Sequence, residues 1–285
     1  MSVKTWTEWL KKSRFSYLND EQKEQTMRWL GEVRDKILTR ADIQPGDVLL
    51  DIGTGTGLLA FGAYDILKNS GKIIASDIAE DCLVECKKIA DACGINDMEF
   101  IHTDINGLKL DDSSVDVAVT RSVLVHIQDK LPAVKEIYRI LKPGGRISIF
   151  EPIISSNTKT CELINPDKFT DYDEIREIEA KIMTDKNDPL TNFDEKVLIN
   201  AFELAGFKNI DLDLSTEKSV YKVTADMIDP WYNTPPSPGT LTMKQKLLRY
   251  LSEEKIDNFI AELKQELDGQ VIEVKSFSAY IRAVR

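Results

Sequence analysis

The chain has 285 residues, of which 42% are hydrophobic and 30% are charged, and its formal net charge is −11. This composition is typical of a soluble globular protein and leaves no apolar run long enough for a membrane span. The acidic charge argues against a broad phosphate-binding surface, so nucleic acid is an unlikely partner. Residues 1–10 show no basic start followed by an apolar stretch, so we expect no secretory signal and a cytoplasmic location.

The first 45 residues are expected to form an N-terminal helical lid segment. Within it, residues 20–40 are polar and carry apolar side chains near helical spacing, which predicts a helix packed on the domain. The aromatic residues that precede this helix either close over a ligand or anchor the chain, and anchoring is the preferred interpretation. They are Trp6, Trp9, Phe15 and Tyr17.

Between residues 46 and 152, apolar runs alternate with amphipathic stretches, the pattern of repeated strand-helix units around a parallel sheet. The expected strands are 47–52, 72–77, 97–102, 114–120 and 145–151, and the expected helices lie near 57–69, 79–92 and 130–141. Pro143-Gly144-Gly145 is expected to end the last of these helices. This segment is the predicted core of an α/β fold.

The strand-helix alternation ends after Pro152, and residues 153–192 are predicted to form a helical lid insertion. Thr170 to Asp173 offers a capping-box start for its helix. The core is expected to continue over 193–223, with Asn192 capping a helix that precedes a strand at 208–214.

A second helical insertion is expected at 224–269, with helices near 242–250 and 253–267. Residues 270–285 have the character of a final core strand. The late helices can cover the pocket of the same chain or meet a second copy, so a homodimer is one assembly left open.

The four cysteines do not form a metal-binding pattern. Cys82 and Cys86 are spaced to share one helix face, but no second pair and no histidine cluster completes a zinc site. We therefore expect no bound metal and reduced, partly buried thiols.

A glycine-rich loop follows the first expected strand of the core. Asp51-Ile52-Gly53-Thr54-Gly55-Thr56-Gly57 stands directly after an apolar run, and a helical pattern begins near Gly57. Glycines allow a sharp strand-to-helix reversal and let a ligand approach the backbone. A tight turn without a ligand is the alternative.

Two carboxylates stand where the next two strands are expected to end. Asp77 can accept hydrogen bonds from vicinal ribose hydroxyls, and Asp104 can accept one from an adenine amino group. Ile105 can cover the face of the adenine ring. Each carboxylate alone is as consistent with a turn, but together they converge on one edge of the sheet and predict an adenosine-containing ligand.

These segments, together with Leu141-Lys142-Pro143-Gly144-Gly145, resemble the successive motifs of class I S-adenosylmethionine-dependent methyltransferases over about 47–152. The resemblance implies a Rossmann-like, seven-stranded, mostly parallel sheet with an antiparallel last strand, helices on both faces and helical lid insertions. It also implies S-adenosyl-L-methionine as the cofactor. The cofactor-binding residues expected from the matching positions are Asp51, Gly53, Thr54, Gly55, Gly57, Asp77, Ile78, Asp104, Ile105, Arg121 and Ser122.

The segment Arg121 to His126 resembles the small-molecule branch that includes the ubiquinone and menaquinone biosynthesis methyltransferases, which implies a small-molecule acceptor. The long segments 153–192 and 224–268 depart from that branch and leave the acceptor unnamed. The alternatives are methylation of RNA or protein, a catalytically inactive cofactor-binding partner protein, a nicotinamide-dependent oxidoreductase and an arsenic methyltransferase. Asp51 and Asp104 argue against the oxidoreductase.

Methyl transfer from a sulfonium is an in-line displacement, so alignment and exclusion of water come first and a dedicated base is optional. His126 and Glu151 are the candidate catalytic bases. Each also has a structural interpretation, His126 as a helix-entry residue and Glu151 as an acceptor for neighbouring backbone N–H groups. Arg121 is expected either to bind an acidic substrate or to help hold the amino-terminal segment in place. Tyr172 and Trp231 are candidate lid contacts, and ordinary packing is preferred for each.

Overall fold

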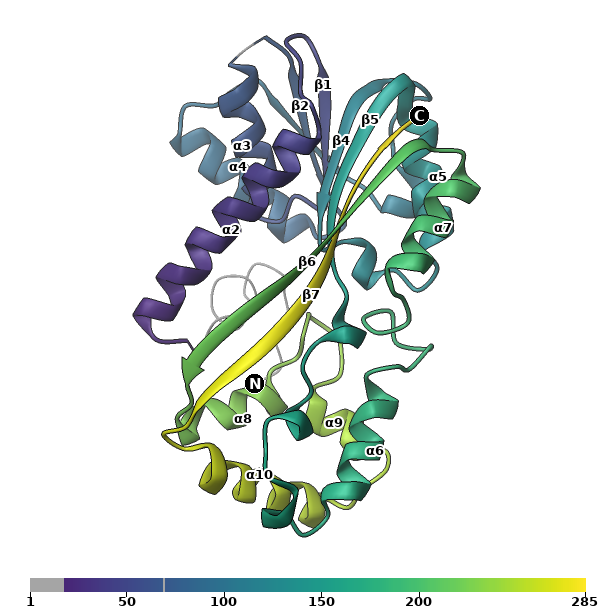
Figure 1. Cartoon of the computed structure of the whole chain (residues 1–285). Helices are drawn as coiled ribbons and strands as arrows, with labels where there is room; N and C mark the ends of the chain where they lie inside the picture. Colours follow the sequence, from purple (N-terminus) through teal and green to yellow (C-terminus); the bar gives the residue numbers. More distant parts are fainter. Residues whose placement is uncertain (1–17, 69) are drawn as a thin grey trace.

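The computed structural model describes residues 18–68 and 70–285 of the chain (Figure 1). The four aromatic residues of the amino-terminal segment lie outside the described residues, so their expected anchoring of the chain, and the alternative that they close over a ligand, both stay predictions. Across the described part, no helix combines the length and the apolar character that a membrane span requires.

Seven strands form a single sheet in the order β3-β2-β1-β4-β5-β7-β6. The first five strands pair in parallel, and β7 runs antiparallel to both β5 and β6. The strands are β1 Val48–Ile52, β2 Lys72–Asp77, β3 Met98–His102, β4 Val115–Arg121, β5 Leu141–Pro152, β6 Lys208–Lys222 and β7 Val271–Val284. The predicted Rossmann-like sheet with an antiparallel last strand is confirmed.

Helices cover both faces of this sheet (Figure 1). The core helices are α2 Asp20–Arg40, α3 Leu58–Leu67, α4 Glu80–Ala92, α5 Lys130–Ile140 and α7 Glu195–Ala205. Apolar side chains of α2 and α3 pack with those of the sheet in one buried cluster, and α5 and α7 contribute to a second buried cluster on the opposite face. The predicted helix 20–40 is confirmed, and a capping box between Asn19 and Gln22 explains where it begins.

The two predicted lid insertions pack together around one hydrophobic cluster of their own, and we call the unit that they form the lid. Its helices are α6 Tyr172–Ile182, α8 Ala225–Asn233, α9 Met243–Leu247 and α10 Glu253–Leu267, so the helix expected at 242–250 is shorter than predicted. Phe169, Ile228 and Phe259 are buried together in this cluster, and Ile272 of β7 joins them. The antiparallel pair β6–β7 therefore runs from the core sheet into the lid, as Figure 1 shows.

Two expected element boundaries are wrong. β6 does not end near residue 214 but continues to Lys222, because its register with β7 holds as far as the pair Lys222 and Val271. Its polar second half lacks the alternation that reveals a strand. β5 begins at Leu141 and not at residue 145 as expected. Helix α5 therefore ends at Ile140, and Pro143, Gly144 and Gly145 lie within the irregular start of the strand.

Two expected helix caps are also wrong. The side chain of Thr170 does not cap α6, because its hydroxyl donates to Glu262 Oε1 of α10 at 2.8 Å. Helix α7 is capped by Asp194, which accepts a hydrogen bond from the backbone N–H of Val197 at 2.9 Å. The amide of Asn192 is engaged by other partners instead.

Candidate active site at the strand ends

The carboxyl ends of the parallel strands meet at one edge of the sheet. Ile52 of β1 lies beside Ser76 of β2 and Thr120 of β4, and Asp77 lies beside His102 of β3. The order of the strands reverses between β1 and β4, which is where open α/β sheets bind ligands. The segments that follow these strands carry the predicted cofactor residues, and the fold brings them together here.

The glycine loop follows β1 in left-handed backbone conformations. The φ angles are 66° at Gly53, 56° at Gly55 and 95° at Gly57. A Cβ atom on Gly53 would lie 2.3 Å from Cγ2 of Val123. The loop therefore packs closely against the segment after β4, and the fold itself requires glycine here.

Gly57→Ala is expected to lower the free energy of unfolding by about 2 kcal/mol, because it adds a crowded contact to an unfavourable φ angle. The new Cβ would lie 2.3 Å from Cε2 of Phe61 and 2.9 Å from Sγ of Cys86. Urea unfolding measures the loss. Gly94→Ala is the matched control, since Gly94 also has a positive φ but its Cβ would have no neighbour within 4 Å. Equal losses in the two variants would contradict the packing argument.

Asp51 is buried near the end of β1, where the residue is 1% exposed. Its Oδ2 accepts hydrogen bonds from Thr54 Oγ1 at 2.7 Å and from the N–H of Ala60 at 3.0 Å. Burial raises the pKa of Asp51 to about 7, although both hydrogen bonds act in the opposite direction. A carboxylate in this environment gains strongly from a neighbouring cation.

Asp77 organises the turn after β2. Its Oδ2 accepts a hydrogen bond from the N–H of Gly55 at 2.8 Å, and its Oδ1 accepts one from the N–H of Ala79 at 2.8 Å. Burial raises its pKa. A carboxylate has about four acceptor positions, so hydroxyl donors of a ligand can still be bound.

The structure distinguishes the two isoleucines expected near an adenine ring. Ile105 is 6% exposed and belongs to the core cluster that also contains Leu50 and Ile74. Ile78, in contrast, is 59% exposed directly after Asp77. Ile78 is therefore the better placed of the two to offer an apolar surface to a ring.

Asp104 lies exposed at the end of the β3 segment and caps a one-turn 3-10 helix. Its Oδ1 accepts hydrogen bonds from the N–H of Asn106 at 2.8 Å and from the side-chain Nδ2 of Asn106 at 3.1 Å. Asp104 therefore has the expected role in a turn, and its carboxylate is also exposed and accessible to a ligand.

Arg121 ends β4 beside two aromatic rings, and Ser122 follows it. The Arg121 guanidinium carbon lies 5.7 Å from the ring centre of Trp29 and 5.8 Å from that of Phe150. Ser122 has a φ of 56°, and its N–H donates to the carbonyl of Phe150 at 2.8 Å. The contribution of Trp29 was missed from the sequence, because it depends on how α2 packs across the sheet.

Glu151 is 0% exposed and binds backbone rather than facing an open space. Its Oε1 accepts hydrogen bonds from the N–H groups of Val123 at 3.0 Å and Leu124 at 2.9 Å, and its Oε2 accepts one from Val125 at 2.9 Å. Burial raises the pKa of Glu151 to about 7, although these bonds lower it. These contacts match the expectation that Glu151 accepts hydrogen bonds from neighbouring backbone N–H groups. His126 lies in the turn whose backbone Glu151 holds.

His102 is a further residue of this edge that sequence reasoning missed. Its Nε2 lies 3.0 Å from the carbonyl oxygen of Ile78, so it links the segments after β2 and β3. The relevant signal is the pairing of these two strands, which periodicity does not reveal.

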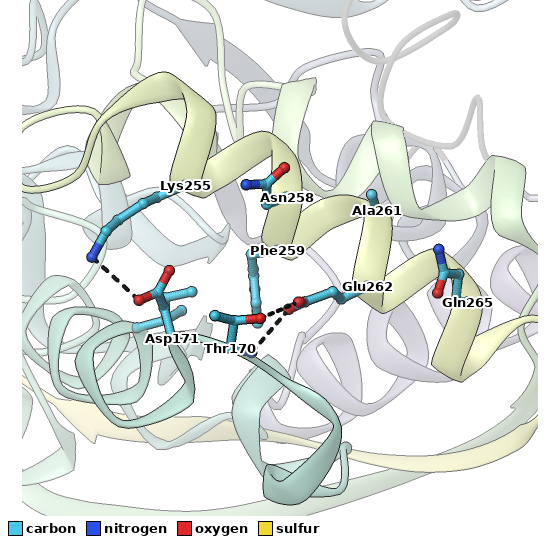
Figure 2. Close-up of a pocket in the computed structure, with 9 residues that line it drawn as sticks. Thr170, Asp171, Lys255, Asn258, Phe259, Ala261, Glu262 and Gln265 are labelled. Carbon is cyan, nitrogen blue, oxygen red and sulfur yellow. Dashed lines mark hydrogen bonds and ion pairs between the residues drawn. The ribbon is translucent and has the colours of Figure 1, made fainter.

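A pocket of about 210 Å³ lies in the lid between the start of α6 and α10 (Figure 2). Its polar groups bind one another, since Lys255 pairs with Asp171 and Thr170 with Glu262. None of the predicted cofactor residues lines it. This pocket is therefore separate from the strand-end site.

The candidate lid contacts Tyr172 and Trp231 pack on the lid's hydrophobic cluster, and the hydroxyl of Tyr172 donates to the carbonyl of Cys161 at 3.0 Å. Cys82 and Cys86 are buried on α4, and neither forms a disulfide within the described residues. Within the part of the chain that the structure describes, no group of three or more His, Cys, Asp or Glu residues is arranged to hold a metal ion.

Comparison with known proteins identifies the family. The family model of a methyltransferase domain matches residues 43–197, which is more than half of the chain. The chain therefore belongs to this family, and its sheet and motifs place it among the class I S-adenosylmethionine-dependent methyltransferases.

Individual relatives match more limited regions. A ubiquinone/menaquinone biosynthesis C-methyltransferase of Francisella philomiragia is 28% identical over 133 residues, which cover 45% of this chain and 53% of that protein. The chain spans between a third and about half of the length of the curated relatives that it matches.

Solved structures show the same fold at low sequence identity. The YcgJ protein of Bacillus subtilis is 18% identical with a TM-score of 0.55, and the match covers 90% of this chain and 97% of that one. Phosphoethanolamine N-methyltransferase 2 of Haemonchus contortus, solved with phosphomonomethylethanolamine and S-adenosylhomocysteine, is 17% identical with a TM-score of 0.54; the match covers 89% and 52%.

Proposed function

We propose that the protein transfers the methyl group of S-adenosyl-L-methionine to a small-molecule acceptor by in-line displacement. The observation that carries this proposal is the pair of buried carboxylates, Asp51 and Asp77, on either side of a left-handed glycine loop. The ligand that suits this pair has a cationic amino group and adjacent hydroxyls, as the adenosyl cofactor does.

The bound cofactor supplies an electrophilic methyl group. We assign its amino group to Asp51, its ribose hydroxyls to Asp77, and its adenine ring to Ile78 and Asp104. The loop 53–57 lines the methionine portion, and the segment after β4 lies beside the reacting centre.

The chemistry requires alignment and a dry site more than a dedicated base. Both oxygens of Glu151 are already engaged by backbone N–H groups, so we assign it a positioning role. His126 stays the candidate base for acceptors that must lose a proton.

A small acceptor is supported by the lid and by the relative named for quinone biosynthesis. The net charge of −11 disfavours an RNA acceptor. Turnover with any acceptor would exclude the inactive binding protein. The cytoplasmic location and the oligomeric state stay predictions.

Calorimetric titration with S-adenosylhomocysteine tests the site directly. Asp77→Asn and Asp104→Ala are each expected to weaken binding about tenfold, the effect of losing one charge-assisted hydrogen bond. Asp97→Ala is the matched control, because Asp97 is an exposed carboxylate immediately before β3, at the opposite end of that strand. Unchanged binding in both site variants would refute the assignment.

Methyl transfer itself is measured with methyl-labelled cofactor offered against quinone precursors, small amines and total RNA. Label in the small-molecule fraction is expected. Label confined to RNA would favour the alternative acceptor.

A further inference from the structure

Lys130 occupies a position that disfavours a positive charge. It is the first residue of α5, where the helix dipole repels a cation, and it is 3% exposed. Burial lowers its pKa to about 8, although the charges of Glu151, Asp129 and Asp188 counteract this. Neither helix stability nor burial explains a lysine here, so its hydrogen bonds must be considered.

The ammonium group of Lys130 has three acceptors, which match its three hydrogens. It donates to the carbonyl of Ile127 at 2.5 Å, to the carbonyl of Pro189 at 3.1 Å and to Oδ1 of Asn192 at 2.6 Å. Ile127 belongs to the segment after β4, whereas Pro189 and Asn192 belong to the first lid insertion. One buried group therefore joins the core to the lid.

Gln128 adds two hydrogen bonds at the same junction. The side-chain Nε2 of Gln128 donates to the backbone carbonyl of Lys186 at 2.9 Å, and the backbone carbonyl of Gln128 accepts a hydrogen bond from Nδ2 of Asn192 at 2.9 Å. We call the five residues Gln128, Lys130, Lys186, Pro189 and Asn192 the junction cluster. Five hydrogen bonds connect them and Ile127, and four of these cross from the core to the first insertion.

The segment 122–128 leads from this cluster to the glycine loop. Glu151 holds its backbone from inside the core, and Val123 fills the space that a side chain on Gly53 would need. On the lid side, Asp188 forms an ion pair with Lys246 of α9 at 2.6 Å. Packed or hydrogen-bonded contacts thus run continuously from α9 of the second insertion to the cofactor loop.

We propose that Lys130 is a positioning residue that couples the lid to the segment 122–128, so that the placement of the lid sets the position of Val123 against Gly53. Buried groups that share several hydrogen bonds move together, because separating them leaves polar atoms unpaired. The choice of S-adenosylhomocysteine as the test ligand rests on the proposed function, but the coupling itself does not.

Hydrogen–deuterium exchange of the full chain tests the coupling without any acceptor. In the ligand-free protein, Lys130→Met is expected to raise amide exchange about tenfold in both 123–128 and 186–192. Lys135→Met is the matched control, since Lys135 is an exposed lysine on the same helix. Faster exchange in only one of the two segments, or in neither, would overturn the proposal.

S-adenosylhomocysteine provides a second readout that general destabilisation does not imitate. In the wild type it is expected to slow exchange in 123–128 and, through Lys130, in 186–192. In Lys130→Met, protection should be confined to 123–128. Protection of 186–192 that survives in this variant would contradict the coupling.

Asn192→Ala keeps the test informative if Lys130→Met does not fold, because Asn192 is only half-buried and contributes two of the five bonds. The same pattern is expected with a smaller amplitude, and unchanged exchange in 123–128 would count against the proposal. Failure of the wild type to bind S-adenosylhomocysteine would refute the proposed function, whereas the ligand-free exchange would still decide the role of Lys130.

Discussion

Glu151→Ala is expected to lower the free energy of unfolding by about 4 kcal/mol, because a buried N–H without a partner costs about 1–3 kcal/mol and three of them lose their acceptor. The donors are the backbone groups of Val123, Leu124 and Val125. Removal of a buried carboxylate offsets part of this loss. Urea unfolding at pH 7 measures the change.

The same variant is expected to weaken binding of S-adenosylhomocysteine, because the segment that packs on Gly53 loses its support. Glu179→Ala is the control with matched chemistry. Glu179 is a buried glutamate of the lid that accepts the N–H groups of Thr160 at 2.8 Å and Cys161 at 3.0 Å. It should destabilise the lid but weaken cofactor binding less than Glu151→Ala does, because Glu179 reaches the cofactor loop only indirectly, through the lid and Lys130. Equal loss of affinity in both variants would remove the special role of Glu151.

Asp51→Asn is expected to weaken binding of S-adenosylhomocysteine about a hundredfold, close to the effect of breaking one buried charge pair. The variant should still fold, because Oδ2 of Asp51 accepts both the Thr54 and the Ala60 hydrogen bonds and an amide oxygen can replace it. Calorimetry at pH 8 measures the affinity. Binding within a factor of about three of wild type would refute the contact with the amino group.

The same substitution should stabilise the ligand-free protein by about 2 kcal/mol at pH 8. Folding raises the pKa of Asp51 from 3.8 to about 7, so the native state holds this proton more tightly than the unfolded chain. The stability that protonated Asp51 contributes to the native state is fully present below about pH 4 and is lost as the pH rises through about 7. The advantage of the asparagine should therefore grow between pH 5 and pH 8, as unfolding experiments at several pH values can show.

Asp116→Asn is the control of opposite sign. Burial alone raises the pKa of Asp116, but hydrogen bonds from Lys142 Nζ and from the N–H of Val48 hold it below its usual value. This carboxylate contributes stability above the pKa of the unfolded state, so the variant should be less stable than wild type at pH 7. A stabilising effect at pH 7 would show that the cited contacts do not govern these carboxylates.

Local sequence patterns determined the core of this protein. The strands expected at 47–52, 72–77, 97–102 and 114–120 differ from β1 to β4 by no more than one residue at either end. Buried parallel strands are short apolar runs, and they are bounded here by glycine, aspartate and polar turns, so neighbouring residues suffice to reveal them. The convergence of the glycine loop, Asp77 and Asp104 followed from these strand ends.

Only the tertiary structure decided which hydrogen-bond partners the polar side chains of Glu151 and Asn192 have. Glu151 caps a turn more than twenty residues away in sequence, and Asn192 binds Lys130 and Gln128 instead of capping a helix. The extension of β6 into the lid depends in the same way on β7, its partner strand. Burial and hydrogen bonding of these groups depend on residues distant in the chain, and sequence periodicity contains no information about such partners.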